Sequence, residues 1–420
     1  MSQDPYAHIE EAFGLDENPF PAEGVSSGSE DEQYSADVFP DETREFRTKI
    51  IRGGLQGGRK MGFLWSMSPT GEDTGFGKTA LMRAHAKEIN ADFGEAVQRA
   101  MGIKPEKVKP IVAAFAEMNE QSRNGLYPVL YAATQNMAAP GGVLEHARVL
   151  LMKAADDDAD EMWEIVAATQ LQLAPSGQAL RPDIMQAFCE SPQALAQLLN
   201  QEVSDASRLR SGIQYFTAAL YILAAAGVNK VFLMLDQLED LGKKGALSAA
   251  KRRREIGRIR DLLEIEPYAS MLHTSFTFHQ AAAQTLETDW QANRLPSFDH
   301  GGSNSAAAVV LRGLQTNEQV EELLKAWMEP KRNEHAGDQP VSPFTSDALG
   351  VLRLVSQGRA GILLNRANQL LWAGAEAQVG EIDGAFARAH FQGQGTAMAG
   401  VGVDIGDGTL ADDDYNDLLA

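Results

Sequence analysis

The chain has 420 residues, of which 44% are hydrophobic, and this composition excludes an intrinsically disordered chain. Its single cysteine, Cys189, excludes a disulfide framework and a cysteine-rich zinc site. The net charge of −21 is concentrated at the two ends, because residues 1–45 carry −12 and residues 401–420 carry six acids and no base. Residues 46–400 therefore carry only −3, so the body of the chain need not repel nucleic acid.

The start of the chain has neither the basic region nor the apolar region of a secretion signal. The longest apolar stretch, residues 215–228, is too short to span a bilayer. We therefore expect a cytoplasmic protein with no membrane partner. The length predicts two or three domains.

Residues 1–45 mix acids with turn-forming residues, and we interpret them as an acidic mobile N-terminal arm. Two short apolar segments, residues 13–15 and 19–21, form one hydrophobic patch in this arm. A short helix is then predicted to begin at Asp41 and to end between Gly53 and Gly58.

A glycine-rich segment, residues 71–79, lies between a predicted strand and a predicted helix. Residues 62–67 are apolar and bounded by Gly and Pro, which is typical of a buried strand. Residues 80–87 are rich in helix formers and contain no helix breaker. A strand, a glycine loop and a helix are the context in which backbone N–H groups and a helix N-terminus bind phosphate.

The spacing within this loop predicts a nucleotide site. Lys78 would reach the terminal phosphates, and the hydroxyl of Thr79 would hold Mg²⁺. The usual motif has a glycine five residues before Gly77, where this chain has Glu72, and Gly71 stands one position earlier. The alternative is a flexible glycine-rich loop that happens to precede a lysine. The candidate nucleotide-binding residues of the loop are Gly71, Thr74, Gly75, Phe76, Gly77, Lys78, Thr79 and Ala80.

Residues 97–206 are alanine-rich and helical in pattern, with breaks at Pro140 and Pro175, and we interpret them as a helical insertion. The acids between Asp156 and Glu161 are either a cation site or a solvated acidic turn, and the pattern favours the turn.

A helix-to-strand unit follows the insertion. Residues 215–226 predict an apolar helix that ends at Gly227, and residues 231–235 predict a strand buried on both faces, as in the middle of a parallel sheet. Asp236 ends this strand, where an acid beside a phosphate loop holds Mg²⁺. The alternative is that Asp236 only caps the next helix. The two motifs in this order favour binding of ATP or GTP.

The residues after Asp236 contain the candidates for water activation. Gln237 occupies the place where many ATPases with these two motifs carry a catalytic glutamate. Glu239 is our first candidate for polarising the attacking water, and Asp240 is the second, because a carboxylate can accept a proton from water.

The strongly basic segment contains our candidate contacts to nucleic acid, Lys251, Arg252, Arg253, Arg254 and Arg258. One alternative is a solvated helix face whose charges pair with Glu255, Asp261 and Glu264. Another is an arginine that reaches the nucleotide of a neighbouring subunit.

A third predicted strand, residues 270–277, ends in hydroxyl groups, of which Thr277 is placed to sense a γ-phosphate. His273 and His279 are interpreted as structural, because no carboxylate lies at ligand spacing. Residues 306–395 return to a helical pattern and predict a helical lid domain, with helix-start signals near Thr316 and Thr345. Residues 396–420 predict a disordered acidic tail.

The order of these motifs resembles that of AAA+ P-loop ATPases, and most closely the origin-recognition and transposition-helper branch. The resemblance covers about residues 46–95 and 207–390. It implies that a short segment before the loop covers the adenine and that a lid arginine contacts the phosphates. In this chain the lid stretch is residues 358–361, with Gly361 at the usual arginine position, and Arg359 and Arg366 nearby. The segment from Asp236 to Glu239 also resembles the second motif of STAND switch ATPases.

We therefore expect an α/β fold with a P-loop NTPase parallel sheet, whose core is formed by residues 46–96 and 207–305. The expected cofactors are ATP and Mg²⁺. The expected function is that of an ATP-hydrolysing assembly factor that forms an ATP-dependent homo-oligomer and acts on duplex DNA with protein partners of a multi-component system in transposition, replication or phage defence. The alternative is a STAND-like signalling switch that binds ATP and no DNA. A P-loop kinase for a small molecule fits less well, because a large lid is typical of subunit-contacting ATPases.

Overall fold

The computed structural model describes residues 4–22, 34–57, 60–66, 74–118, 125–175, 181–201, 205–241, 248–277, 280–297 and 307–393. The chain divides into two compact units. The sheet unit comprises residues 44–65 and 82–309, and the helical unit comprises residues 1–43, 66–81 and 310–420.

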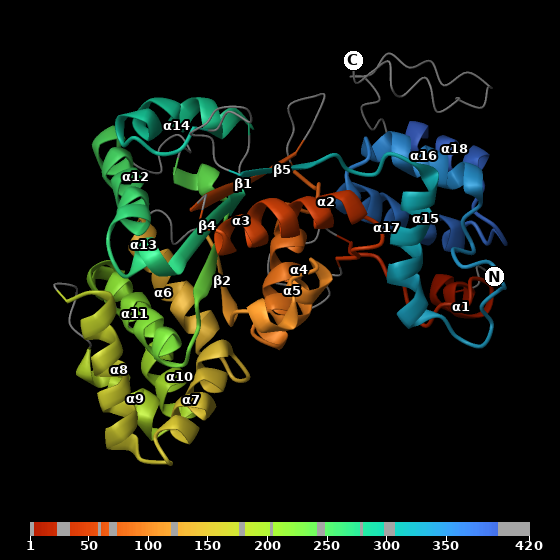
Figure 1. The fold of residues 1–420 in the computed structure, drawn as a ribbon. Helices are drawn as coiled ribbons and strands as arrows, with labels where there is room; N and C mark the ends of the chain where they lie inside the picture. Colours follow the sequence, from red (N-terminus) through yellow and green to blue (C-terminus); the bar gives the residue numbers. More distant parts are fainter. Residues whose placement is uncertain are drawn as a thin grey trace. The chain divides into compact units, whose positions relative to one another are not determined.

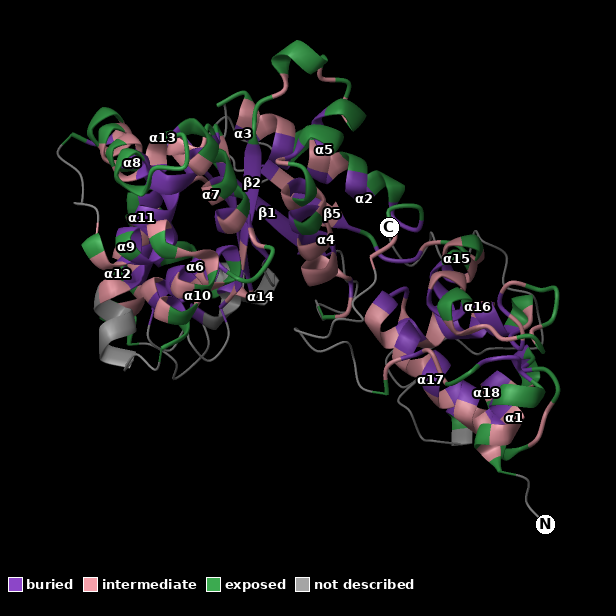
Figure 2. Cartoon of the chain, turned by 90° about the horizontal axis from the view of Figure 1, so that it is seen from below, coloured by how far each residue is buried: buried purple, intermediate pink, exposed green. Residues whose placement is uncertain are grey.

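The described strands form one five-stranded sheet in the order β2-β3-β4-β1-β5 (Figure 1). The pairings β1–β4, β2–β3 and β3–β4 are parallel. β1 and β2 are buried among helices, as Figure 2 shows, and this burial explains their nearly continuous apolar sequences. The predicted α/β fold with a parallel sheet is confirmed. The strand bounds are β1 (Met61–Ser66), β2 (Ile111–Glu117), β3 (Lys230–Asp236), β4 (Leu272–Thr277) and β5 (Ala307–Leu311).

Helices cover both faces of the sheet. On one face, alternate strand residues such as Leu233 and Phe276 belong to the main apolar cluster. On the other face, Gly54 packs so closely that a β-carbon there would lie 2.8 Å from the ring of Phe232. The first face is covered by α6 (Leu126–Met137), α11 (Asp205–Ala225), α12 (Ala249–Glu264) and α14 (Gln280–Ala292), and the second by η1 (Phe46–Arg52), α3 (Gly53–Leu55) and α4 (Lys78–Ala91).

Side-chain amides satisfy the outer edge of β2. The amide of Asn90 donates to the carbonyl of Ala113 at 2.9 Å and accepts from its N–H at 2.7 Å. Gln98, in α5 (Glu95–Ala100), makes the same pair of contacts with Lys109 at 2.7 and 3.2 Å. These contacts close an edge that would otherwise offer unpaired backbone groups to another strand.

The predicted helical insertion contains mostly helices, but the prediction missed β2 within it. Residues 111–117 are rich in alanine, a strong helix former, and pairing with β3 overrides that local preference. Asp158 caps the N-terminus of α8 by accepting from the amides of Asp160 and Glu161, which agrees with the interpretation of an acidic turn. The other helices of this segment are α7 (Val143–Ala154), α8 (Ala159–Leu173), α9 (Pro182–Glu190) and α10 (Pro192–Asn200).

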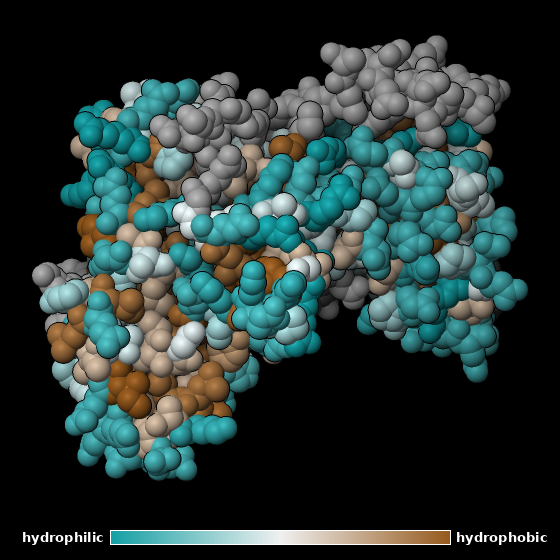
Figure 3. Space-filling model, viewed as in Figure 1, coloured by the Kyte–Doolittle hydropathy of each residue, from teal (hydrophilic) through white to brown (hydrophobic). Residues whose placement is uncertain are grey.

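The surface of these helices carries exposed apolar side chains. Figure 3 shows hydrophobic residues gathered over the segment from α7 to α10, and the exposed large ones include Val149 and Leu150 in α7 and Leu171 in α8.

In the helical unit, the predicted helix signals correspond to observed caps. Thr316 forms a capping box with Gln319 at the start of α15, and Thr345 precedes α16. The helices of this unit are α1 (Pro5–Glu11), α15 (Asn317–Met328), η5 (Glu329–Lys331), α16 (Ser346–Ser356), α17 (Ala360–Glu376) and α18 (Gly384–Gly393), and α2 (Pro40–Glu45) begins in it. The remaining described elements of the chain are η2 (Pro105–Lys107), η4 (Leu238–Leu241) and α13 (Tyr268–Met271).

The prediction of a mobile N-terminal arm does not hold for residues 4–22 and 34–45. Phe13, Leu15 and Phe20 are buried in the apolar cluster of α15 to α18. The side-chain amide of Asn368 also donates to the carbonyl of Phe20 at 2.6 Å. The acids dominated the composition of this segment, whereas a few spaced apolar residues decide its packing.

The predicted helical lid begins with a strand, β5, that the sequence analysis missed.

The predicted acidic tail, residues 396–420, lies outside the described residues. Among the residues that the structure describes, no helix combines the length and the apolar character that crossing a membrane requires.

Candidate functional site

The glycine loop of the helical unit is described from Thr74 onward, and Gly71 lies outside the described residues. Gly75 and Gly77 have φ angles of 86° and 84°, in the region that favours glycine. The helix α4 begins directly after the loop, because the amide of Leu81 donates to the carbonyl of Gly77 at 2.9 Å. The loop therefore delivers the chain into a helix N-terminus, whose dipole favours an anion.

Lys78 is held at the carboxyl end of β1. Its Nζ donates to Oγ of Ser66, the last residue of that strand, at 2.9 Å. Thr79 and Ala80 follow in the first turn of α4. Phe76 is buried, and a β-carbon on Gly313 would lie 3.1 Å from its ring. The side chain of Phe76 therefore anchors the loop, and its predicted contact with the nucleotide would use its backbone.

The lid stretch lies directly against the loop within the helical unit. The amide of Gly361 donates to the carbonyl of Gly75 at 2.9 Å. A β-carbon on Gly75 would lie 3.4 Å from Ile362 and 3.6 Å from the β-carbon of Arg359. The structure thus brings together two segments that the sequence analysis singled out separately.

Arg359 is 8% exposed and precedes α17, and its Nε donates to the carbonyl of Ser356 at 3.4 Å. Its β-carbon lies near Gly75, so Arg359 is beside the loop. Its contact with the phosphates stays a prediction.

In the sheet unit, the ends of β3 and β4 are tied by polar contacts. The hydroxyl of Thr277 donates to Oδ1 of Asp236, and both side chains are 1% exposed. Thr277 also accepts from the amide of Gln237 at 2.8 Å. The register pairs Leu64 of β1 with Thr277, so these residues lie at the carboxyl edge of the sheet. A buried carboxylate whose orientation is fixed by a hydroxyl can serve as a ligand for Mg²⁺.

The candidates for water activation lie just beyond this pair. Gln237 has a φ angle of 61°, a backbone conformation that few residues other than glycine adopt. Glu239 and Asp240 belong to η4, and their side chains lie outside the described part of the chain. The choice among the three stays a prediction.

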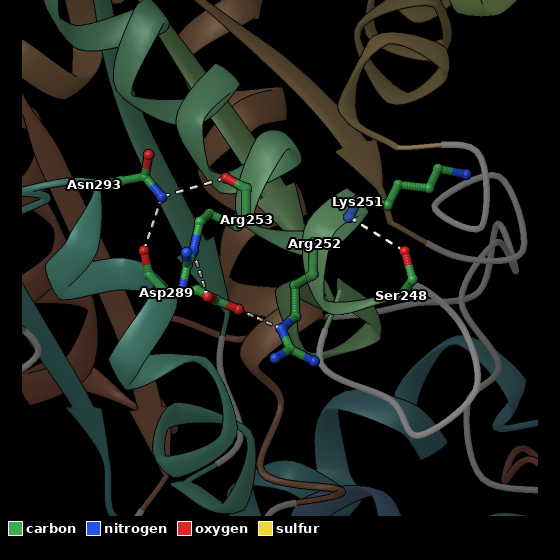
Figure 4. Close-up of polar contacts among 6 residues, drawn as sticks. All are labelled: Ser248, Lys251, Arg252, Arg253, Asp289 and Asn293. Atoms are coloured by element: carbon green, nitrogen blue, oxygen red, sulfur yellow. Dashed lines mark hydrogen bonds and ion pairs between the residues drawn. The ribbon is translucent and has the colours of Figure 1, made fainter.

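The basic segment forms α12, and two of its arginines converge on an acid that the sequence analysis missed (Figure 4). Nε of Arg252 lies 2.7 Å from Asp289 Oδ2, and Nε of Arg253 lies 3.1 Å from Asp289 Oδ1. Asp289 is nearly buried and comes from α14. No local spacing could reveal this partner, because it lies more than thirty residues further along the chain.

Glu255 explains the placement of Arg258. Its buried carboxylate accepts from the amide of Leu126 at 3.0 Å and from Arg258 at 2.8 and 2.9 Å. The guanidinium of Arg258 also lies 3.8 Å from the centre of the Tyr127 ring. This cluster caps the start of α6. Of the pairings that the alternative of a solvated, paired helix face named, the structure has Arg258 with Glu255 and Arg260 with Glu264, whereas Arg252 pairs with Asp289. The side chains of Arg253 and Arg254 remain 62% and 65% exposed. The amide of Lys251 donates to Ser248 (Figure 4).

His273 lies in the core of the sheet unit, fully buried, against Phe232 and Gly54. Burial, with a smaller effect from the charge of Lys230, lowers its pKa to about 3. His273 is therefore neutral and structural, as we expected; His279 lies outside the described residues. In the described part of the chain, no three His, Cys, Asp or Glu side chains are grouped to hold a metal ion.

No protein-family model and no curated protein matches this chain. Among solved structures, the chain is similar to the ORC2 protein of Aeropyrum pernix, solved as ADPNP–ADP complexes. The sequence identity is 10% and the TM-score is 0.43, over 86% of this chain and 68% of that chain.

Proposed function

We propose that this protein binds ATP with Mg²⁺ and hydrolyses it. The observation that carries the proposal is the glycine loop that ends at Lys78, followed at once by the N-terminus of α4. Left-handed glycines, a lysine held at the end of a buried strand and a helix N-terminus are the elements of a phosphate site.

The assigned roles follow from the chemistry of each group. Lys78 and the amides of the first turn of α4 bind the phosphates, while Arg359 approaches them from the lid. Thr79 and Asp236 supply the hydroxyl and carboxylate oxygens that Mg²⁺ prefers, and Thr277 orients the carboxylate. Bound Mg²⁺ neutralises the charge that develops on the phosphates. Glu239 accepts a proton from the attacking water, with Gln237 and Asp240 as the other candidates.

At the level of the biological task, we propose an ATP-dependent assembly factor that oligomerises and acts on duplex DNA with protein partners. The charge distribution supports this, because the acids gather at the ends and leave the body near neutral. The second candidate is a STAND-like ATP switch without DNA. The motif from Asp236 to Glu239 supports it, and so do the ion pairs that hold Arg252 and Arg258 within the fold.

The test of nucleotide binding is Lys78→Ala, with Lys87→Ala as the matched control in the same helix. Lys87 is exposed and lies more than two turns beyond the loop. We expect Lys78→Ala to abolish or severely weaken binding of a labelled ATP analogue without changing the circular dichroism spectrum, and Lys87→Ala to bind as the parent does. Parental affinity in Lys78→Ala would overturn the assignment.

Size measurement with and without ATP, followed by titration with duplex DNA, separates the two biological candidates. An assembly factor should enlarge and bind DNA with ATP. A protein that binds ATP under the same conditions and shows no affinity for DNA supports the switch.

A further inference from the structure

Lysines gather at the amino-terminal edge of the sheet, at the opposite ends of the strands from Asp236 and Thr277. We call this group the lysine edge, and all its members belong to the sheet unit. Four of them are exposed, and Lys230 is half-buried. The members are Lys60, Lys104, Lys107, Lys109 and Lys230.

Strand pairing places these lysines together. Lys230, the first residue of β3, is in register with Ile111, the first residue of β2, and Lys109 lies two residues before Ile111. Lys60 directly precedes β1, and its carbonyl accepts from the amide of Thr274 at 2.9 Å. With about 4.8 Å between strands, the edge from β2 to β1 spans about 14 Å. Lys104 and Lys107 extend it through the short helix η2.

Two of the lysines also have a structural role. Nζ of Lys60 donates to the carbonyl of Leu263 at 2.9 Å, and Nζ of Lys230 donates to the carbonyl of Ser270 at 2.6 Å. These carbonyls lie near the C-termini of α12 and α13, where a cation is favoured. Lys60 and Lys230 keep their positive charges in this role, so both still contribute to the electrostatic potential of the lysine edge.

The edge carries an excess of positive charge. Within the described part of the chain, none of the five lysines forms an ion pair. The acids near them include Glu106, between the exposed lysines, and Glu266, which accepts from Ser270. Glu264 follows Leu263, whose carbonyl Lys60 contacts, and forms an ion pair with Arg260. Mutual repulsion is visible at Lys230, whose pKa is lowered first by burial and then by the charges of Lys60 and Lys109.

We propose that the lysine edge binds the phosphate backbone of duplex DNA. Lysine is a point charge that contacts phosphates without reading bases, which suits a sequence-independent backbone contact. Residues 104–109 expose no large hydrophobic side chain that would anchor a protein partner. This inference deepens the DNA part of the proposed function and rests on it.

The lysine edge and the proposed metal ligand Asp236 lie at opposite ends of the same strand, β3. Lys230 and Asp236 are the first and last residues of β3, a strand of seven residues. At about 3.3 Å per residue, the two edges lie about 20 Å apart. DNA on the lysine edge would therefore lie at the opposite end of β3 from Asp236. In α12, by contrast, Arg252 and Arg258 are held in ion pairs.

The test compares the parent with the triple variant Lys104→Gln, Lys107→Gln, Lys109→Gln on a 30-base-pair duplex. Binding is followed by fluorescence anisotropy over a range of salt concentrations with a non-hydrolysable ATP analogue. Removing about three phosphate contacts should weaken binding roughly tenfold or more and reduce the salt slope by about 2.7. These residues are exposed, so the fold should be kept. The matching Lys→Arg triple variant should bind as the parent does, because it keeps the charge.

The control is Arg253→Gln with Arg254→Gln, which removes the exposed charges of α12. We expect it to weaken DNA binding less than the lysine variant does, because it removes two charges instead of three and Arg253 is already paired with Asp289. If the α12 variant loses binding and the lysine variant does not, DNA binding stands and the lysine edge is wrong. If the parent binds the ATP analogue but no DNA, both the lysine edge and the DNA role fail, while nucleotide binding stands. Binding of an acidic peptide in place of DNA also overturns the inference.

Discussion

The hydroxyl of Thr277 donates a hydrogen bond to Asp236 and accepts one from the amide of Gln237 at 2.8 Å. One side chain at the end of β4 thereby fixes both the carboxylate at the end of β3 and the backbone that leads to Glu239. Both the proposed metal ligand and the segment proposed to activate water depend on this contact.

Replacement of Thr277 by valine should lower both stability and ATP hydrolysis. The change keeps the shape but leaves a buried carboxylate and an amide without this partner, which costs about 1–3 kcal/mol in the free energy of unfolding. The Mg²⁺ concentration required for half-maximal hydrolysis should rise, because the carboxylate loses its fixed orientation. Chemical denaturation and a Mg²⁺ titration of the ATPase rate measure the two effects.

Thr274→Val is the matched control in the same strand. Thr274 is fully buried, and within the described part of the chain its hydroxyl has no hydrogen-bond partner. This variant should be as stable as the parent or more stable, with an unchanged Mg²⁺ dependence. If the two variants show the same Mg²⁺ dependence as the parent, Thr277 has no role in orienting a metal ligand.

Gly77→Ala should weaken nucleotide binding, and Gly57→Ala should not. Both glycines have positive φ angles, 84° and 72°, and in both a β-carbon would meet no atom within 4 Å. Each substitution should therefore cost about 1–2 kcal/mol through backbone strain alone. Only Gly77 orients amides toward the proposed phosphates, so only its variant should lose affinity in an ATP-analogue titration. Equal affinity in both variants would contradict the phosphate cradle.

Glu239→Gln should preserve ATP binding and reduce hydrolysis roughly a hundredfold or more, because an amide can orient water but cannot accept its proton. Single-turnover hydrolysis and equilibrium binding of an ATP analogue separate the two effects. Gln237→Ala and Asp240→Asn serve as comparisons. A parental rate in Glu239→Gln would move the role to one of those residues or to another subunit.

His273 should make the protein less stable as the pH falls below neutrality. Its pKa is about 3 in the folded protein, against 6.5 for the ordinary side chain, so only the unfolded chain takes up a proton between these values. Stability is therefore lost as the pH falls from about 6.5 toward 3, by about 2 kcal/mol between pH 7 and pH 5. Denaturation of the parent and of His273→Leu at several pH values measures this difference. An identical loss of stability in both proteins would show that other groups cause it.

The local patterns of the sequence were sufficient to predict the central strands and the glycine loop. The apolar run ending at Asp236 became β3, and Gly227 has the left-handed conformation expected after the helix before it, with a φ angle of 89°. These features depend on neighbours within a few residues, because periodicity, glycine conformation and helix caps are local properties.

Amino-acid composition gave wrong predictions for segments whose structure depends on a few long-range contacts. Residues 4–22 are acidic, yet their Phe13 and Phe20 are buried in the apolar cluster of α15 to α18. Residues 111–117 are rich in helix formers, yet they pair as β2 at the edge of the sheet. Burial of apolar area and backbone pairing depend on contacts between distant segments. The composition of one segment does not show these contacts.

The partners of the site residues were decided only by tertiary structure. Gly361 was known from its sequence as a departure at the arginine position, but its hydrogen bond to Gly75 depends on how the lid helix packs. Asp289 is the acid that Arg252 and Arg253 share, although their own helix supplies nearer candidates in sequence. A charged side chain pairs with the acid that the fold brings within hydrogen-bond distance and removes from water, and that acid can lie anywhere along the chain.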